Sequence, residues 1–148
     1  MRRSMLAVAI VSLAVLGCQA PAADSTAKEE PATIESVAGE GQLHRITLTQ
    51  RAAQRLGIQS VAVARAAGAG SRVQIPYSSV IYDAEGNAWA YIEDGAPLVY
   101  VRHPITVDDI VKDAAGDYAI LSEGPELGTA VVSVGVAELF GAEFEVGH

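Results

Sequence analysis

The chain has 148 residues, a formal net charge of −8, and hydrophobic side chains at 50% of its positions. This length suits a single domain with its own hydrophobic core. The acidic balance argues against binding to nucleic acid or to anionic lipid headgroups, because like charges repel. The single cysteine excludes a disulfide within the chain.

Residues 1–18 have the pattern of an export signal. Arg2 and Arg3 precede an apolar run, Met5 to Leu16, which is shorter than the roughly 20 residues that a membrane-spanning helix needs. The run ends in Leu16-Gly17-Cys18, which resembles the lipobox of bacterial lipoproteins. We therefore predict a signal peptide at residues 1–17 and lipidation of Cys18. The alternative is an ordinary secreted protein with a chance cysteine near its cleavage site.

Lipidation implies a location in the cell envelope. Acyl chains on Cys18 would hold the mature protein on a membrane, facing the periplasm. In the lipoproteins that this segment resembles, a residue other than Asp after the cysteine directs export to the outer membrane, so Gln19 favours the outer over the inner membrane. Loss of Arg2 and Arg3 leaves a net charge of about −10, so the lipid must supply the membrane contact.

The lipidated cysteine and the residues up to 42 are expected to form a flexible tether, because residues 19–42 are rich in Ala, Pro, Glu, Ser and Thr without apolar periodicity. The folded domain is then expected at residues 43–148. Its first elements are a strand at Arg45–Leu48, a helix at Gln50–Leu56 between the caps Thr49 and Gly57, and a strand at Ile58–Val63.

The stretch from Arg72 to Val107 predicts two successive β-hairpins, with turns at Ala84–Asn87 and Asp94–Pro97. The last strand of this stretch is expected to bury one face. Its odd positions form an apolar face that is predicted to face the core, interrupted by His103: Val99, Val101, Ile105 and Val107. The residues between them, Tyr100, Arg102 and Thr106, are predicted to face outward.

A third hairpin is predicted around Asp113–Asp117, and Gly124–Gly128 turns the chain again. Thr129–Val136 is a valine-rich strand expected to be buried on both faces. Ala137–Phe140 is expected to make one helical turn before the chain trails off. Together these elements predict an all-β fold with one short helix, an antiparallel β-roll or small barrel of about six or seven strands.

The order of these features resembles the membrane-proximal domain of the periplasmic adaptor subunits, or membrane fusion proteins, of resistance-nodulation-division efflux pumps. The resemblance is carried by Ile46–Val63, Ile75–Val80, Trp89–Ile92, Val101–Val107, Gly116–Asp117 and Ile120–Gly128. It implies contact with an efflux transporter or an adaptor protein. A complete adaptor would carry further domains and a long helical hairpin where this chain has only Arg65–Ser71, so we expect the membrane-proximal module to stand alone.

The histidines and the cysteine do not predict a metal site. His44, His103 and His148 have no spacing typical of metal ligands, and Cys18 is taken by the lipobox. His103 interrupts an apolar face, and is either a pH-sensitive ligand or an ordinary edge histidine beside Pro104.

The carboxylates and serines do not predict catalysis either. Asp108 and Asp109 are adjacent, so on a strand they face opposite sides and cannot share a proton. Ser78 and Ser79 lack the Gly-x-Ser-x-Gly context of a nucleophilic serine. We therefore expect no enzyme activity, no cofactor and no metal.

Four aromatic residues are candidates for contact with a partner: Tyr82, Trp89, Tyr91 and Tyr100. Cross-strand packing in the core is the alternative for each of them. The sequence thus leaves two functions open. The first is a lipid-anchored interaction module, an accessory or truncated adaptor-like component of an efflux system. The second is a stand-alone envelope lipoprotein that is structural or binds a small ligand.

Overall fold

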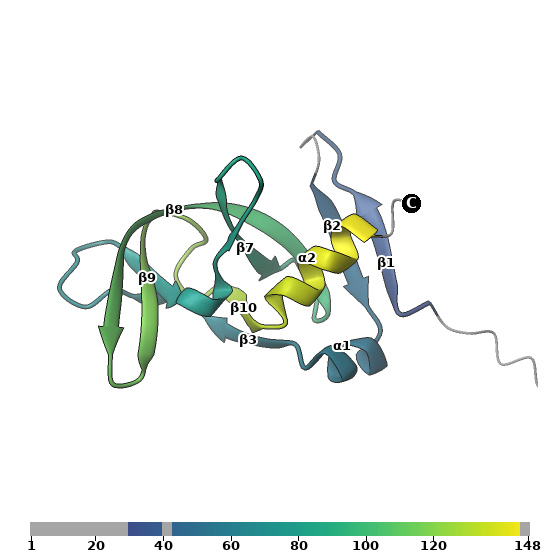
Figure 1. The fold of residues 1–148 in the computed structure, drawn as a ribbon, viewed down its shortest axis with the longest axis horizontal. Coiled ribbons are helices and arrows are strands. Elements are labelled where there is room, and N and C mark those ends of the chain that lie inside the picture. Colours follow the sequence, from purple (N-terminus) through teal and green to yellow (C-terminus); the bar gives the residue numbers. More distant parts are fainter. Residues whose placement is uncertain (1–29, 40–42, 146–148) are drawn as a thin grey trace, which may run out of the picture.

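A computed structural model describes residues 30–39 and 43–145 (Figure 1). The predicted signal peptide and Cys18 lie outside the described residues. The strands are β1 (Ala32–Ser36), β2 (His44–Leu48), β3 (Gln59–Ala62), β4 (Ala64–Arg65), β5 (Val73–Pro76), β6 (Ile81–Tyr82), β7 (Ala88–Glu93), β8 (Val99–Asp113), β9 (Gly116–Glu123) and β10 (Ala130–Val134). The helices are α1 (Gln50–Leu56), the 3₁₀ turn η1 (Tyr77–Ser79) and α2 (Val136–Glu145).

The strands form one antiparallel sheet that is nearly closed into a barrel. Seven of them follow the order β3-β10-β7-β8-β9-β5-β4, and β1, β2 and β6 join as side branches. The two ends of this path, β3 and β4, are separated only by Val63. The N–H of Val63 donates to the carbonyl of Thr129 (2.8 Å), and its own carbonyl accepts from the N–H of Gly128 (2.9 Å). The predicted all-β, antiparallel fold class is confirmed.

Two hydrophobic clusters lie on opposite sides of β10. Val131 belongs to a cluster with Val63, Ile75, Ala90, Ile105, Ala119 and Leu121. Val132 belongs to the other cluster, with Ile46, Leu48, Tyr91, Tyr100, Val136 and Leu139. Neither valine is exposed to solvent. Because successive side chains of a strand point to opposite faces, β10 is buried on both at Val131 and Val132, as predicted. The prediction is wrong at the end of the segment, where Val134 is 45% exposed and Val136 begins α2.

Several elements form where local features of the sequence predict them. The hydroxyl of Thr49 accepts a hydrogen bond from the N–H of Ala52 (3.1 Å) at the start of α1, and Gly57 ends the helix with a φ of 67°. Gly86, at a φ of 87°, turns the chain between β6 and β7. The connection Arg65–Ser71 closes a hairpin, since Ala64 and Arg65 pair with Gln74 and Val73.

Two predictions about the chain ends are wrong. Within the expected tether, Ala32–Ser36 forms β1, because its backbone pairs along the whole length of β2. At the other end, the expected single turn at Ala137–Phe140 is part of the first half of the longer helix α2, Val136–Glu145. Its apolar stripe packs onto the sheet, which outweighs the weak helix propensity of Gly141.

The predicted orientation of β8 is wrong over its first half. Tyr100 and Arg102, expected to face outward, are only 2% and 5% exposed. Helix α2 lies across this side of the sheet (Figure 1), and its residues Val136 and Leu139 share a cluster with Tyr100. Ile105 faces the second cluster, as predicted. Where α2 covers the strand, the buried face is therefore the one predicted to face outward, whereas Val99, Val101 and His103 on the other face are only partly buried.

Candidate functional site

A buried ion pair joins β8 to α2. The Nε atom of Arg102 lies 2.8 Å from Oε2 of Glu143, and the side chains are 5% and 0% exposed. Glu143 belongs to the stripe that α2 turns toward the sheet, since it follows Val136, Leu139 and Phe140 at helical spacing. Removing two charges from water is costly, so such a pair needs further hydrogen bonds to be stable.

Two side chains of the sheet supply these further contacts to Glu143. The hydroxyl of Tyr91 donates to Oε2 (2.5 Å), and Nδ1 of His44 lies 3.4 Å from Oε1. Burial of the Tyr91 phenol raises its pKa far above the usual range, and the neighbouring Glu143 carboxylate adds to this effect. Tyr91 is therefore a permanent donor. A carboxylate without exposed surface and surrounded by donors fastens α2 to the sheet.

Aromatic rings surround the guanidinium group of Arg102. Its Cζ atom lies 4.8 Å from the centre of the Trp89 ring, 5.0 Å from that of Phe144 and 6.0 Å from that of Phe140. These distances are within the range of cation–π attraction. Trp89 thus contacts the ion pair from the side of the sheet, and the two phenylalanines contact it from α2.

The β6–β7 turn holds Trp89 in place. Its indole Nε1 donates to Oδ2 of Asp83 (2.9 Å), which also accepts from the side-chain amide of Asn87 (2.9 Å). These hydrogen bonds, first that of Asn87 and then that of Trp89, lower the pKa of Asp83 to about 2. The carboxylate is therefore charged at any physiological pH, and the indole orientation does not change with pH in that range.

The rings around Arg102 border a surface pocket of about 370 Å³. Its walls are Leu43, Trp89, Phe140 and Phe144, Arg102 contributes from the sheet, and the acidic turn residues Asp83 and Glu85 lie at its edge. The lining combines these apolar side chains with one cationic group, which is already paired with Glu143, and with the two carboxylates of the turn. The pocket can accept a small side chain or ligand.

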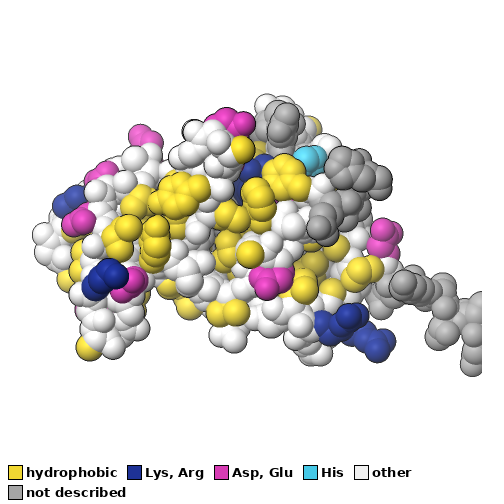
Figure 2. All heavy atoms as spheres, in the orientation of Figure 1, with side chains coloured by type: hydrophobic (Ala, Val, Ile, Leu, Met, Phe, Trp, Pro, Cys, Tyr) yellow, Lys and Arg dark blue, Asp and Glu magenta, His cyan; other side chains and the backbone are white. Residues whose placement is uncertain are grey.

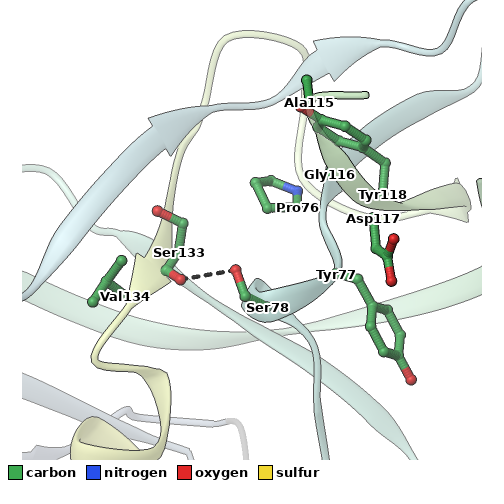
Figure 3. A pocket seen from close by; sticks show the side chains of 9 residues that line it. All are labelled: Pro76, Tyr77, Ser78, Ala115, Gly116, Asp117, Tyr118, Ser133 and Val134. Carbon is green, nitrogen blue, oxygen red and sulfur yellow. Dashed lines mark hydrogen bonds between the residues drawn. The ribbon is translucent and has the colours of Figure 1, made fainter. Parts of the chain in front are cut away.

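A second pocket, of about 530 Å³, lies between η1, β10 and the start of β9. Figure 3 shows Ser78 reaching toward β10, where its hydroxyl donates to the carbonyl of Ser133 (2.9 Å). The pocket also contains Asp117, whose carboxylate lies 3.2 Å from Nζ of Lys112. Ser78, Ser133 and Asp117 thus have partners within the protein.

The four predicted contact residues differ in their exposure to solvent. Tyr82 is 48% exposed and Trp89 is partly buried, so both can reach a partner. Tyr91 and Tyr100 are 0% and 2% exposed. They are not contact residues, and the prediction is wrong for them because α2 covers the face on which they lie.

Other predicted positions have structural surroundings of their own. Within the described residues no group of three or more His, Cys, Asp or Glu side chains could hold a metal ion. Asp108 accepts hydrogen bonds from Ser122 (2.8 Å) and Arg72 (3.3 Å), whereas Asp109 accepts from the N–H of Ile110 (2.8 Å). In the same part of the chain, no helix has the length and apolarity needed to cross a membrane.

Sequence reasoning missed Glu143 and the role of Arg102. The segment after Phe140 was expected to trail off, and Arg102 was expected to face solvent. A signal was present, because Val136, Leu139, Phe140 and Glu143 are spaced as one face of a helix. A charged residue within such a stripe indicates a buried partner of opposite charge.

Comparison of the chain with protein-family models, with curated proteins and with solved structures found no match.

Proposed function

We propose that this protein is a lipid-anchored module of the cell envelope that binds a subunit of an efflux system, either a transporter or an adaptor protein. The observation that carries the proposal is a lipobox-like segment, Leu16-Gly17-Cys18, ahead of a β domain in which Arg65–Ser71 makes a short hairpin. In the adaptor subunits that the sequence resembles, the domain nearest the transporter is interrupted at this point by the remaining domains.

The distribution of polar and apolar groups supports binding as the activity. The buried carboxylate of Glu143 is occupied by Arg102, Tyr91 and His44 and contributes to the stability of the domain. Large apolar side chains remain on the surface instead, and Figure 2 shows them gathered over both the α2 side and the β8–β9 side of the molecule. The large apolar residues that are exposed on the molecule include Tyr82, Ile110, Val111, Leu127 and Phe144. Such a surface is suited to contact with another protein.

The pocket beside Arg102 favours a second candidate function. Its apolar walls, Leu43, Trp89, Phe140 and Phe144, would suit a small ligand in a stand-alone envelope lipoprotein. On this alternative, a bound ligand would quench the fluorescence of Trp89, and the protein would need no efflux subunit as a partner.

Crosslinking in intact cells tests the proposal. A photoreactive residue placed at Tyr82 or Lys112, both exposed, is expected to crosslink to an efflux transporter or adaptor subunit, identified by mass spectrometry after envelope solubilisation. The same residue at Arg51, an exposed polar position on α1, controls for random collision. Crosslinks that contain only unrelated envelope proteins at all three positions would contradict the proposal.

The anchor has its own test. Cys18→Ser should prevent lipidation, so the protein is expected in the soluble envelope fraction or as an unprocessed precursor. A variant that is processed and sediments with membranes like the parent would show that Cys18 is not the anchor.

A further inference from the structure

The second half of β8, Thr106–Asp113, has an unpaired edge. On one side this half pairs with β9, from Thr106↔Glu123 to Asp113↔Gly116. On the other side, pairing with β7 ends at Ile105↔Ala88, and within the described residues no strand continues it. An antiparallel strand directs its backbone groups alternately to its two sides, so this edge presents free hydrogen-bonding groups. We refer to Thr106–Asp113 as the outer half of β8.

The outer half of β8 projects beyond the core as a hairpin with β9 (Figure 1). Ile110 and Val111 are neighbours and therefore point to opposite faces, yet they are 41% and 43% exposed. Both faces of the hairpin are thus bare. Exposed β-branched residues beside an open edge are what an added strand would cover.

A pocket of about 530 Å³ lies where β7 leaves β8. It is lined by Tyr82, Trp89, Pro104, Ile105, Thr106 and Val107, together with Gly86, Asn87 and Ala88 of the β6–β7 turn. A strand added to the outer half of β8 would continue the line of β7 and end at this pocket. One of its side chains would then lie beside Trp89 and Pro104, in a pocket whose other walls include the polar residues Asn87 and Thr106.

The charge of the edge indicates the kind of strand that fits. Asp108, Asp109 and Asp113 lie on this half of the strand. Asp108 is paired with Arg72 (3.3 Å) and Lys112 with Asp117 (3.2 Å), and Asp113 accepts from the N–H groups of Ala115 and Gly116 in the turn, which leaves Asp109 as the carboxylate with neither a cationic partner nor a turn contact among the described residues. The carboxylate of Asp109 accepts a hydrogen bond from the N–H of the next residue, Ile110 (2.8 Å). Pairing with the same edge of a second copy would bring aspartates against aspartates, which is unfavourable. A basic strand would meet complementary charge.

We propose that the outer half of β8 binds an extended, basic segment of a partner protein by strand addition, with an apolar side chain of that segment in the pocket beside Trp89. The proposal rests on the proposed function as a protein-binding module, and it names the surface and the chemistry of the partner. Backbone pairing supplies the contact, and the aspartates select against acidic segments and against self-association.

A peptide probe tests this surface directly. The probe is an eight-residue peptide that alternates valine and lysine, and its matched control has glutamate in place of each lysine. With the purified full chain in detergent, the lysine probe is expected to bind at least about tenfold more tightly than the glutamate probe. It should also slow amide hydrogen exchange in Thr106–Asp113, because added pairing occupies the free backbone groups.

Two variants with the same change in charge give the control. Asp109→Lys is expected to weaken binding of the lysine probe about tenfold, since it places a repulsive charge on the edge. Glu126→Lys, at an exposed site in a separate turn, should leave binding within about twofold. Equal binding of both probes, equal effects of both variants, or exchange protection confined to other strands would each overturn the proposal.

The outcome of the peptide test can be distinguished from the outcome of the crosslinking test of the proposed function. Crosslinking of an efflux subunit from Tyr82 without probe binding at Thr106–Asp113 would reject this surface while keeping the efflux role. Probe binding at the edge with only unrelated proteins crosslinked in cells would keep the strand-addition surface and reject the efflux role.

Discussion

The two halves of β8 have contrasting environments, although they are one continuous strand. In the inner half, Val99–Ile105, the strand lies between β2 and β7 and is covered by α2, so that even Arg102 is buried. In the outer half, Thr106–Asp113, it has β9 as its partner on one side, and Ile110 and Val111 are exposed. Composition accounts for only part of this difference, because the outer half carries most of the charged residues of β8, yet the inner half buries Arg102.

The contrast shows that the environment of a strand depends on which other elements pack over it. A single helix, α2, turns one face of the inner half into an interior that requires charge pairing, whereas the outer half needs no such compensation. Substitutions in the inner half should therefore be costly to stability, and comparable ones in the outer half should not.

The largest effect is expected for Arg102→Ala. It leaves the Glu143 carboxylate buried without its cation, so the free energy of unfolding should fall by about 3 to 5 kcal/mol in urea denaturation followed by circular dichroism. The control is Arg45→Ala, which removes an ion pair to Asp94 whose side chains are 41% and 38% exposed. That variant should lose less than about 1 kcal/mol. Equal losses would mean that the buried pair does not hold α2.

The start of α2 provides a second test. Gly135 has a φ of 87°, and an added Cβ would lie 2.2 Å from Cδ1 and 3.4 Å from Cα of Ile58. Gly135→Ala is therefore expected to lower the free energy of unfolding by about 2 to 3 kcal/mol. Gly86→Ala has the same φ but meets no atom within 4 Å, and should cost only about 1 kcal/mol. Calorimetric melting temperatures would separate the clash with Ile58 from the backbone cost.

Trp89 lies at the boundary between the covered and the bare regions, so its removal should have an intermediate effect. Trp89→Ala loses the partly buried ring, the contact with Arg102 and the hydrogen bond to Asp83, and is expected to cost about 2 kcal/mol. Trp89→Phe keeps a ring over Arg102 and loses the indole N–H, so about 1 kcal/mol is expected. Chemical denaturation of both variants is the measurement, and a loss from Trp89→Ala below that from Trp89→Phe would contradict this assignment.

The smallest effect is expected in a matched pair of isoleucines on β8. Ile105 is 7% exposed and Ile110 is 41% exposed. Ile105→Val removes a buried methylene and should cost about 1 kcal/mol, whereas Ile110→Val should change the free energy of unfolding by less than about 0.5 kcal/mol. If the two variants lose the same amount, the outer half is covered in solution, for instance by another protein.

The sequence alone predicted the elements whose causes are local. Thr49 and Gly57 delimit α1 by hydrogen bonds and backbone conformation within a few residues, and Gly86 turns the β6–β7 hairpin because it tolerates a positive φ. The valines of β10 predicted burial on both faces by their composition. These signals lie within the segment that they shape, so they can be interpreted without knowledge of the rest of the chain.

Only the tertiary structure determines which side chains come into contact. The burial of Arg102 depends on a helix that begins more than thirty residues later, and Glu143 becomes its partner only because α2 packs onto the inner half of β8. Tyr91 and Tyr100 were predicted to contact a partner, but that helix covers them. Strand β1 forms because the backbone of β2 is available to pair with it. Burial is a property of what packs on a residue, and that neighbour is distant in sequence.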